Sequence, residues 1–213
     1  MRSRAASRQR LLAAAAEVLG KGGFTAATTN EIAARAGVAV GTLYLHFGDK
    51  EGIARAVALE ALADLRARLR AAVERAHATI ADAARAHAAA LVDFVADPRA
   101  RGRLLFAVDA PGLRNDVLDE MASLQKAHLL ERGRDGYFRT DVHAGAAAQA
   151  LVGMQSRTLM WWLEDPRRAT RLEIIDTLAR LRLSGIHDGA RGAARGRARR
   201  KATQAAKRRR SRP

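Results

Sequence analysis

Side chains that can hydrogen-bond gather in residues 36–53, within a chain otherwise built largely of alanine, arginine and leucine. Thr42, Tyr44, His46 and Lys50 follow Gly37 over a few turns of chain. Such groups reach base edges and phosphate oxygens in nucleic-acid complexes. His46 has no His, Asp or Glu four residues away, so the spacing does not favour a metal site. The chemistry indicated is therefore recognition of a nucleic acid.

Patterns typical of catalysis do not occur in this sequence. It contains no G-x-S-x-G, no glycine-rich phosphate loop and no His/Asp/Glu cluster with metal-ligand spacing. Cysteine is absent, which removes disulfides, thiolate ligands and cysteine nucleophiles. We therefore expect no enzyme activity, no cofactor and no metal.

Positive charge is concentrated at the two ends of the chain. The 38 Lys/Arg against 22 Asp/Glu give a formal net charge of +16, which favours polyanionic partners. Residues 185–213 hold 11 Lys/Arg and a single Asp, a net charge of +10. No large apolar residue follows Ile186, so residues 186–213 are predicted to be a disordered basic tail. Such a tail is either a solvated extension or a nonspecific contributor to DNA affinity through counterion release.

Periodicity of three and four residues predicts an all-α chain of about nine helices. No apolar run approaches the roughly 20 residues that span a bilayer, and no signal peptide is evident, so we expect a cytoplasmic protein without a membrane partner. Thr28 with Glu31, Asp49 and Asp141 are predicted N-caps. The first helix should end at the glycines of residues 20–23. The expected helices cover about 5–20, 28–36, 39–46, 50–76, 78–96, 99–109, 113–132, 142–164 and 167–184.

The second and third helices form a helix-turn-helix pattern. Ala33 is small where the helices would cross, Gly37 can take a positive φ in the turn, and Leu43 would anchor the third helix. The remaining side chains of that helix then point outward, as a helix lying in a major groove requires. The outward set is Ala39, Val40, Thr42, Tyr44, Leu45 and His46. Arg4, Arg8 and Arg10 are either solvated charges or clamps on phosphate or the minor groove.

The string GFTAATTNEIAARAGVAVGTLYLHFGDKEGIARAV, residues 23–57, resembles the DNA-binding domain of the tetracycline-repressor (TetR) family of bacterial transcription regulators. The resemblance implies a homodimer, DNA binding through residues 1–50, and a second domain that holds a small-molecule pocket and the dimer interface. It also implies the DNA-binding residues, which are Thr28, Thr29, Asn30, Ala39, Val40, Gly41, Thr42, Tyr44, Leu45, His46 and Lys50.

Within that set, the resemblance assigns base reading to Val40, Gly41 and Thr42, and phosphate contacts to Tyr44, His46 and Lys50. Two residues depart from the family pattern. Ala39 cannot cap its helix, which weakens the helix start by about 1 kcal/mol. Val40 cannot hydrogen-bond a base and packs at most on a thymine methyl, so direct readout should be sparse.

The aromatic and polarizable residues of the second module predict a ligand pocket, with an ordinary core as the alternative. These residues are Phe94, Leu105, Phe106, Met121, Leu124, His128, Met154, Gln155, Trp161 and Trp162. The last two helices predict a two-fold dimer contact, with an internal core face as the alternative. The contact residues are Ala150, Leu151, Met154, Thr158, Leu172, Ile175, Leu178, Ala179 and Leu183.

The sequence therefore predicts a helix-turn-helix DNA-binding domain (1–48), a helical ligand-binding and dimerisation domain (49–185) and a basic tail (186–213). The predicted function is a transcription regulator, most simply a repressor. It would bind a palindromic double-stranded operator as a homodimer and be released by a small-molecule effector. Its place would be the cytoplasm, at the nucleoid when bound to DNA. The alternative is a nonspecific architectural DNA-binding protein that uses the basic tail.

Overall fold

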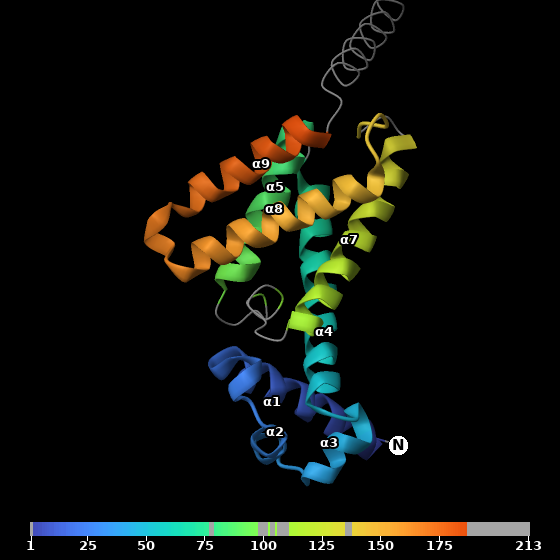
Figure 1. Ribbon diagram of the computed structural model, residues 1–213, viewed down its shortest axis with the longest axis vertical. Coiled ribbons are helices and arrows are strands. Elements are labelled where there is room, and N and C mark those ends of the chain that lie inside the picture. Colours follow the sequence, from blue (N-terminus) through green and yellow to red (C-terminus); the bar gives the residue numbers. More distant parts are fainter. Residues whose placement is uncertain are drawn as a thin grey trace, which may run out of the picture.

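The computed structural model describes residues 2–76, 79–97, 102, 105, 111–134 and 138–186 (Figure 1). This part of the chain contains eight α-helices and one 3-10 turn, which confirms the all-α prediction. The helices are α1 (Arg2–Ala26), α2 (Thr29–Ala36), α3 (Val40–Phe47), α4 (Lys50–Arg75), α5 (Ile80–Ala96), α7 (Pro111–Arg134), α8 (Ala144–Glu164) and α9 (Arg171–Ile186), and the 3-10 turn η1 is Pro166–Arg168.

Two of the predicted segments lie mainly outside the described residues. Of the helix expected over residues 99–109, only residues 102 and 105 are described, and both are helical. Residues 187–213 of the predicted basic tail are not among the described residues either.

Helices α1, α2 and α3 form a small bundle at one end of the molecule (Figure 1). Its core contains Leu11, Leu12, Ile32 and Leu43, none of which has measurable exposed surface. The first helix was predicted to end at residues 20–23, and the helical backbone of α1 is interrupted at Gly23, although a short further helical stretch extends the element to Ala26. Gly23 adopts φ 75° and ψ 177°, which produces this interruption.

The predicted caps of the first module are confirmed. The Thr28 hydroxyl accepts from the Glu31 N–H at 3.1 Å, and the Asp49 carboxylate accepts from the Gly52 N–H at 2.6 Å. Ala39 precedes α3 without a side-chain cap, as expected.

The caps of the last two helices differ from the prediction. His143, not Asp141, caps α8, because its Nδ1 accepts from the Ala146 N–H at 3.2 Å. The final helix begins at Arg171 rather than near residue 167, since η1 intervenes. A Thr170/Glu173 capping box sets this start: the Glu173 carboxylate accepts from the Thr170 N–H at 2.7 Å, and the Thr170 hydroxyl accepts from the Glu173 N–H at 3.3 Å.

Helix α4 runs from the N-terminal bundle into the second module (Figure 1). Ile53 and Val57 are buried in the core of the bundle, whereas Ala58 and Leu62, on the following turns, are buried in the core of the second module. Leu113 of α7 packs against both cores. The Arg55–Asp116 ion pair joins α4 to α7 beside this contact.

The second core is built by α4, α5, α7, α8 and α9. Its two most extensive helix–helix contacts are those between α5 and α9 and between α7 and α8. Leu65, Leu91, Phe94 and Leu159 are at most 2% exposed in this core. A smaller cluster around Leu129, Phe138, Ala148 and Leu151 closes the other end of α7 and α8.

Leu43 and Leu45 provide a matched test of the packing beneath α3. Leu43 is fully buried and Leu45 is 79% exposed, although both lie on the same short helix. We predict that Leu43→Ala lowers the free energy of unfolding of the N-terminal bundle by about 2–5 kcal/mol, through lost burial and a cavity. Leu45→Ala should change it by less than about 0.5 kcal/mol. Urea denaturation followed by circular dichroism measures both, and equal effects would contradict the packing described.

Candidate nucleic-acid interface

The turn between α2 and α3 has the geometry that the helix-turn-helix pattern predicted. Gly37 lies in the left-handed region, with φ 63° and ψ 43°. Its N–H donates to the Ala34 carbonyl and the Val38 N–H to the Ala33 carbonyl, both at 3.1 Å. This hydrogen-bond pair ends α2 and fixes the direction in which α3 departs. Any residue with a Cβ would be strained at Gly37.

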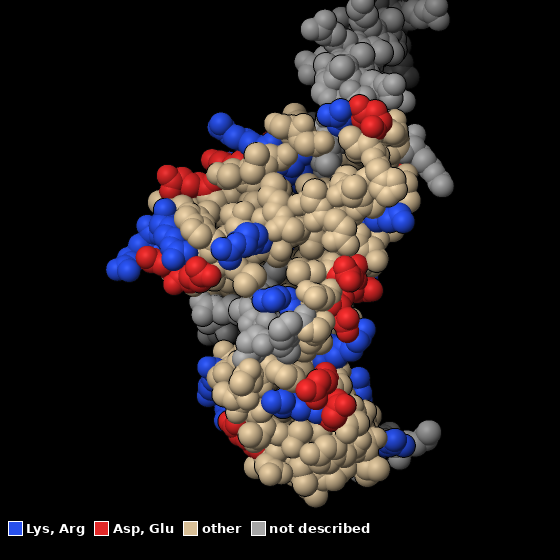
Figure 2. Space-filling view, viewed as in Figure 1, with Lys and Arg blue, Asp and Glu red and all other residues tan. Residues whose placement is uncertain are grey.

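One face of α3 is turned outward from the bundle. Tyr44 is 49% exposed, and Ala39 and Gly41 are exposed near the start of the helix. Val40, Thr42 and His46 are half-buried. Figure 2 shows the tip of the molecule, where α2 and α3 lie, as a mostly uncharged surface in this view. A short, neutral, protruding helix can enter a major groove without placing an acidic group against phosphate.

Tyr44 joins the two helices of the motif. Its hydroxyl lies 3.2 Å from the Thr29 hydroxyl, so the side chain of α3 is held against the first turn of α2. Thr29 is half-buried and Asn30 is exposed beside it. The unsatisfied N–H groups at the start of α2 therefore lie beside the Tyr44 hydroxyl, an arrangement suited to a phosphate.

His46 is held by α1 through a contact that the sequence analysis missed. Its Nε2 lies 3.2 Å from the Ser7 hydroxyl, and that hydroxyl donates to the Arg4 carbonyl at 2.9 Å. Because the single proton of Ser7 is used for this carbonyl, the His46 Nε2–H is the donor to Ser7. The start of α1 is thereby tied to the end of α3.

Lys50 makes internal contacts that the prediction of a phosphate role did not include. Its ammonium donates to the Phe24 carbonyl at 3.1 Å and to the Ala27 carbonyl at 3.2 Å. It also lies 4.3 Å from the centroid of the Phe24 ring. These contacts join the start of α4 to the end of α1, where carbonyls lack helical partners.

Arg8 and Arg10 of α1 border the helix-turn-helix. The Arg8 guanidinium lies over the Phe47 ring, 5.4 Å from its centroid. The Arg10 side chain approaches the turn, because a Cβ at Gly37 would lie 3.8 Å from its Nη1. Arg8 and Arg10 remain exposed, and their positive charge therefore lies beside α3.

The predicted pocket residues of the second module do not form one lining. Phe94, Leu105, Gln155 and Trp162 are buried. Met121, Leu124 and Met154 are half-buried and pack against the same core, and Phe106 lies outside the described residues. His128 is exposed and stacks edge-on against Phe138, with ring centroids 5.5 Å apart. Its place in a ligand pocket stays a prediction.

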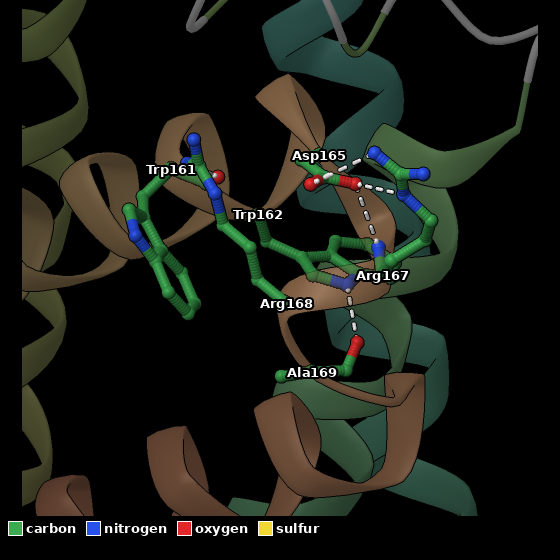
Figure 3. Close-up of polar contacts among 6 residues, drawn as sticks. All are labelled: Trp161, Trp162, Asp165, Arg167, Arg168 and Ala169. Carbon is green, nitrogen blue, oxygen red and sulfur yellow. Dashed lines mark hydrogen bonds and ion pairs between the residues drawn. The ribbon is translucent and has the colours of Figure 1, made fainter.

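The two adjacent tryptophans face different directions, as expected for neighbours on a helix (Figure 3). The Trp162 indole is buried and donates to the Ala169 carbonyl at 2.9 Å, which holds the corner between α8 and α9. Trp161 is 38% exposed and lies beneath the Arg168 guanidinium, 5.5 Å from it. Trp161 therefore lies at the surface of α8, and its place in a ligand pocket stays a prediction.

Asp165 caps the corner between the two helices. Its carboxylate accepts from the backbone N–H and the Nε–H of Arg167, at 3.1 and 2.9 Å (Figure 3). These two hydrogen bonds are the main reason that the pKa of Asp165 is lowered.

A buried polar group in the second module was also missed. Arg182 of α9 is 5% exposed, and burial lowers its pKa to about 10. Burial also lowers the pKa of His87 on α5, helped by the positive charges of Arg182 and His128. The Gln125 Nε2 on α7 is buried without a hydrogen-bond partner. The only sequence signal was a basic residue at a position where the α9 periodicity requires an apolar one.

The predicted dimer contact requires correction at four positions. Leu151, Ile175, Leu178 and Ala179 are at most 5% exposed and belong to the cores of the protomer itself, so they are not open to a partner. Met154, Thr158 and Leu183 are half-buried, and Ala150 and Leu172 are exposed. The exposed stripe of α8 is Ala146, Ala150, Gly153, Arg157 and Trp161.

Neither a metal site nor a membrane span is found among the described residues. No group of three or more His, Asp or Glu in that part of the chain could hold a metal ion. None of the helices described is long and apolar enough to cross a bilayer.

Comparison with known proteins identifies the first module. Residues 11–57 match the family model for bacterial regulatory proteins of the tetR family. This match spans α1 to the second turn of α4, which is the set of elements that forms the N-terminal core. No curated protein matches the sequence.

Solved structures of transcription regulators share the fold of the described chain. FadR of Bacillus subtilis, solved in complex with stearoyl-CoA, is 21% identical; the match covers 84% of this chain and 99% of that chain, with a TM-score of 0.66. TylP, a tetR regulator from Streptomyces fradiae, is 27% identical over 89% of this chain and 90% of its own, with a TM-score of 0.63. SmeT, the repressor of the Stenotrophomonas maltophilia multidrug efflux pump SmeDEF, is 17% identical over 86% and 91%, with a TM-score of 0.66.

The match to the family model falls on the helices that carry the helix-turn-helix geometry, and the fold of the remaining helices is that of regulators such as TylP. Residues 11–57 are therefore a DNA-binding domain of the type found in bacterial regulatory proteins of the tetR family, and the chain as a whole has the fold of such regulators.

Proposed function

We propose that this regulator is a repressor that binds a palindromic operator as a homodimer and is released by a small-molecule effector. The observation that carries the proposal is the outward face of α3, which Tyr44 holds against α2 and His46 holds against α1. Lys50 joins the start of α4, directly after α3, to the end of α1. Two such helices, related by a two-fold axis and about 34–36 Å apart, fit successive major grooves on one face of DNA.

The residues that would contact base edges lie in the first turn of α3. Val40 offers a thymine methyl only an apolar contact, and Thr42 is the first residue of the helix whose side chain can hydrogen-bond a base. Tyr44, with Thr29 and the start of α2, would bind phosphate. Specificity would then depend partly on the shape of the operator, because few base-edge hydrogen bonds are available.

The proposed dimer contact uses the exposed stripe of α8 together with the exposed side of α9. Ala146, Ala150 and Gly153 are small and allow a partner helix to approach closely. Trp161, Leu172 and Leu181 are large apolar groups that remain 38–57% exposed on the same two helices. Figure 2 shows few charged side chains along α8 in this view. A two-fold contact would cover this face.

Effector binding in the second module would act on DNA binding through α4 and α7. The Arg55–Asp116 pair and Leu113 connect α7 to the part of α4 that is buried in the N-terminal core. The FadR complex with stearoyl-CoA supports an effector for this fold. An effector can shift the balance only by its differential affinity for the two states. The protein would carry out this function in the cytoplasm, at the nucleoid while bound.

The alternative, a nonspecific architectural protein, is favoured by the basic end of the sequence and the weakly polar α3. Selection of bound sites from random double-stranded DNA with the full-length protein distinguishes the two. We expect enrichment of a short palindrome whose half-site centres are separated by about one helical turn. Recovery of unselected sequence at all salt concentrations would instead establish the architectural function.

Lys50→Met tests whether this residue also contacts DNA. Removing the ammonium breaks two partly buried hydrogen bonds to backbone carbonyls, so the free energy of unfolding should fall by about 1–3 kcal/mol. Operator affinity should also fall, and the slope of log K against log salt should become shallower by about 0.9 for each lost phosphate contact. Lost stability with an unchanged slope would restrict Lys50 to joining α1 and α4. Arg66→Met, at an exposed position farther along α4, serves as the control.

Truncation after Gly185 tests the role of the basic end. Residues 186–213 account for a net charge of +10, and such charge acts by counterion release without reading sequence. We predict a shallower salt slope and weaker binding to all DNA, with the ratio of operator to random DNA unchanged. Fluorescence anisotropy at several salt concentrations measures both quantities. A collapse of that ratio would make the segment a sequence reader.

A further inference from the structure

A basic side chain is buried in the second module without a counter-charge. Arg182 is 5% exposed, and it forms no hydrogen bond or ion pair with any other residue in the described ranges. Its Nη1 is fully buried. An uncompensated buried charge costs several kcal/mol in general, so such groups normally have a partner.

The nearby carboxylates of the same helix interface have other partners. Asp176 of α9 pairs with Arg85 of α5, and Asp93 of α5 pairs with Arg171 of α9. Both pairs lie at the surface, where the side chains are 41–52% exposed. The α5–α9 contact thus satisfies its exposed charges and leaves Arg182 unpaired.

A second unsatisfied donor lies on the neighbouring helix α7. The Gln125 Nε2 is buried without a partner, and Gln125 lies one turn before His128 on α7. Both His128 and Arg182 are close enough to His87 of α5 to lower its pKa by their charge. No carboxylate within hydrogen-bond reach of Arg182 is found among the described residues.

The turns that precede these donors are apolar. Leu178 and Ala179 come before Arg182 on α9, and Met121 and Leu124 come before Gln125 on α7. Ala88 and Leu91 of α5 are buried in the same core. Met121 and Leu124 are half-buried, and methionine adapts to the shape of what it contacts. A ligand that satisfies the donors would lie with its body against these apolar side chains.

We propose that Arg182 binds the anionic head group of an amphipathic effector, a carboxylate or a phosphate monoester with an aliphatic body, at the contact between α5 and α9. This rests on the proposed effector-responsive function. The guanidinium matches either anion with two parallel N–H···O hydrogen bonds. Both head groups share the required chemistry, and the test separates them.

Such a ligand would affect the helix that leads to DNA. It would bind at the contact of α9 with α5, and α5 packs along α4 in the same core. Pairing would also remove the cost of the buried charge, so the liganded arrangement would be favoured by interactions that the free protein lacks.

Thermal unfolding of the full-length protein tests the proposal with four probes of equal chain length: decanoate, decyl phosphate, 1-decanol and decyltrimethylammonium, each below its aggregation concentration. We expect one or both anions to raise Tm, because a ligand of the folded state stabilises it by mass action. The alcohol and the cation should bind at least about tenfold more weakly, since they lose a charge-assisted hydrogen-bonded pair. Equal stabilisation by all four probes, or by none, would overturn the proposal.

Substitutions then assign the anion to Arg182. Arg182→Met should raise the Tm of the free protein, because an apolar group of similar length replaces an unpaired buried charge. It should also abolish the preference for the anions over 1-decanol. Arg180→Met removes an exposed charge from the same helix and should keep both the Tm and the preference. A lower Tm with the preference intact in Arg182→Met would give Arg182 a structural role and overturn the proposal.

Operator binding is measured separately on the same proteins. Anion binding that depends on Arg182 but leaves operator affinity unchanged would support the site and refute the effector response. Operator binding by a protein that no anion stabilises would refute the site and leave the DNA-binding function in place.

Discussion

The structure depends on one helix being shared by two hydrophobic cores. The first two turns of α4, with Ile53 and Val57, complete the core of the DNA-binding bundle, and the next turns, with Ala58 and Leu62, begin the core of the second module. Because protein interiors are closely packed, α4 cannot shift in one core without disturbing the other. A boundary at residue 48 separates the helix-turn-helix in sequence, but the bundle needs residues beyond it for its core. The tetR family match extends to residue 57 and so includes those two turns.

The residues predicted to contact DNA also hold the motif together. Tyr44 is tied to Thr29, His46 to Ser7, and Lys50 to the carbonyls of Phe24 and Ala27. Tyr44 and His46 join α3 to α2 and to α1, so the outward face of α3 is positioned by two of its own side chains. Lys50 joins α4 to the end of α1. An interface fixed in this way loses little side-chain entropy when DNA binds. A substitution at these positions therefore changes both the placement of α3 and its contacts, and only a measurement such as the salt slope separates the two.

Local signals in the sequence were sufficient for the first module. Thr28, Gly37 and Asp49 fix helix boundaries within a few residues of themselves, and all three have the predicted geometry. The errors arose where a position depends on distant partners. In the alanine-rich α8 and α9, several stripes satisfy the same periodicity, and only the packing against α5 and α7 decides which stripe is buried. Ile175 and Leu178 were placed on the wrong side for this reason. The cap on α8 was missed because an imidazole, unlike Asp141, is not a usual N-cap.

The second module shows why a candidate ligand site is harder to find from sequence than a DNA-binding helix. Aromatic residues indicated a pocket, yet Phe94 and Trp162 are core residues and Trp161 is covered by Arg168 at the surface. The unusual feature of this interior is a buried arginine without a carboxylate partner in the described part of the chain. Two arginines at the α5–α9 contact have carboxylate partners, and a third, Arg182, is the most deeply buried and has none in the described part of the chain. The α9 periodicity would place an apolar residue there at lower cost, and this cost is the reason that we propose an anionic ligand for Arg182.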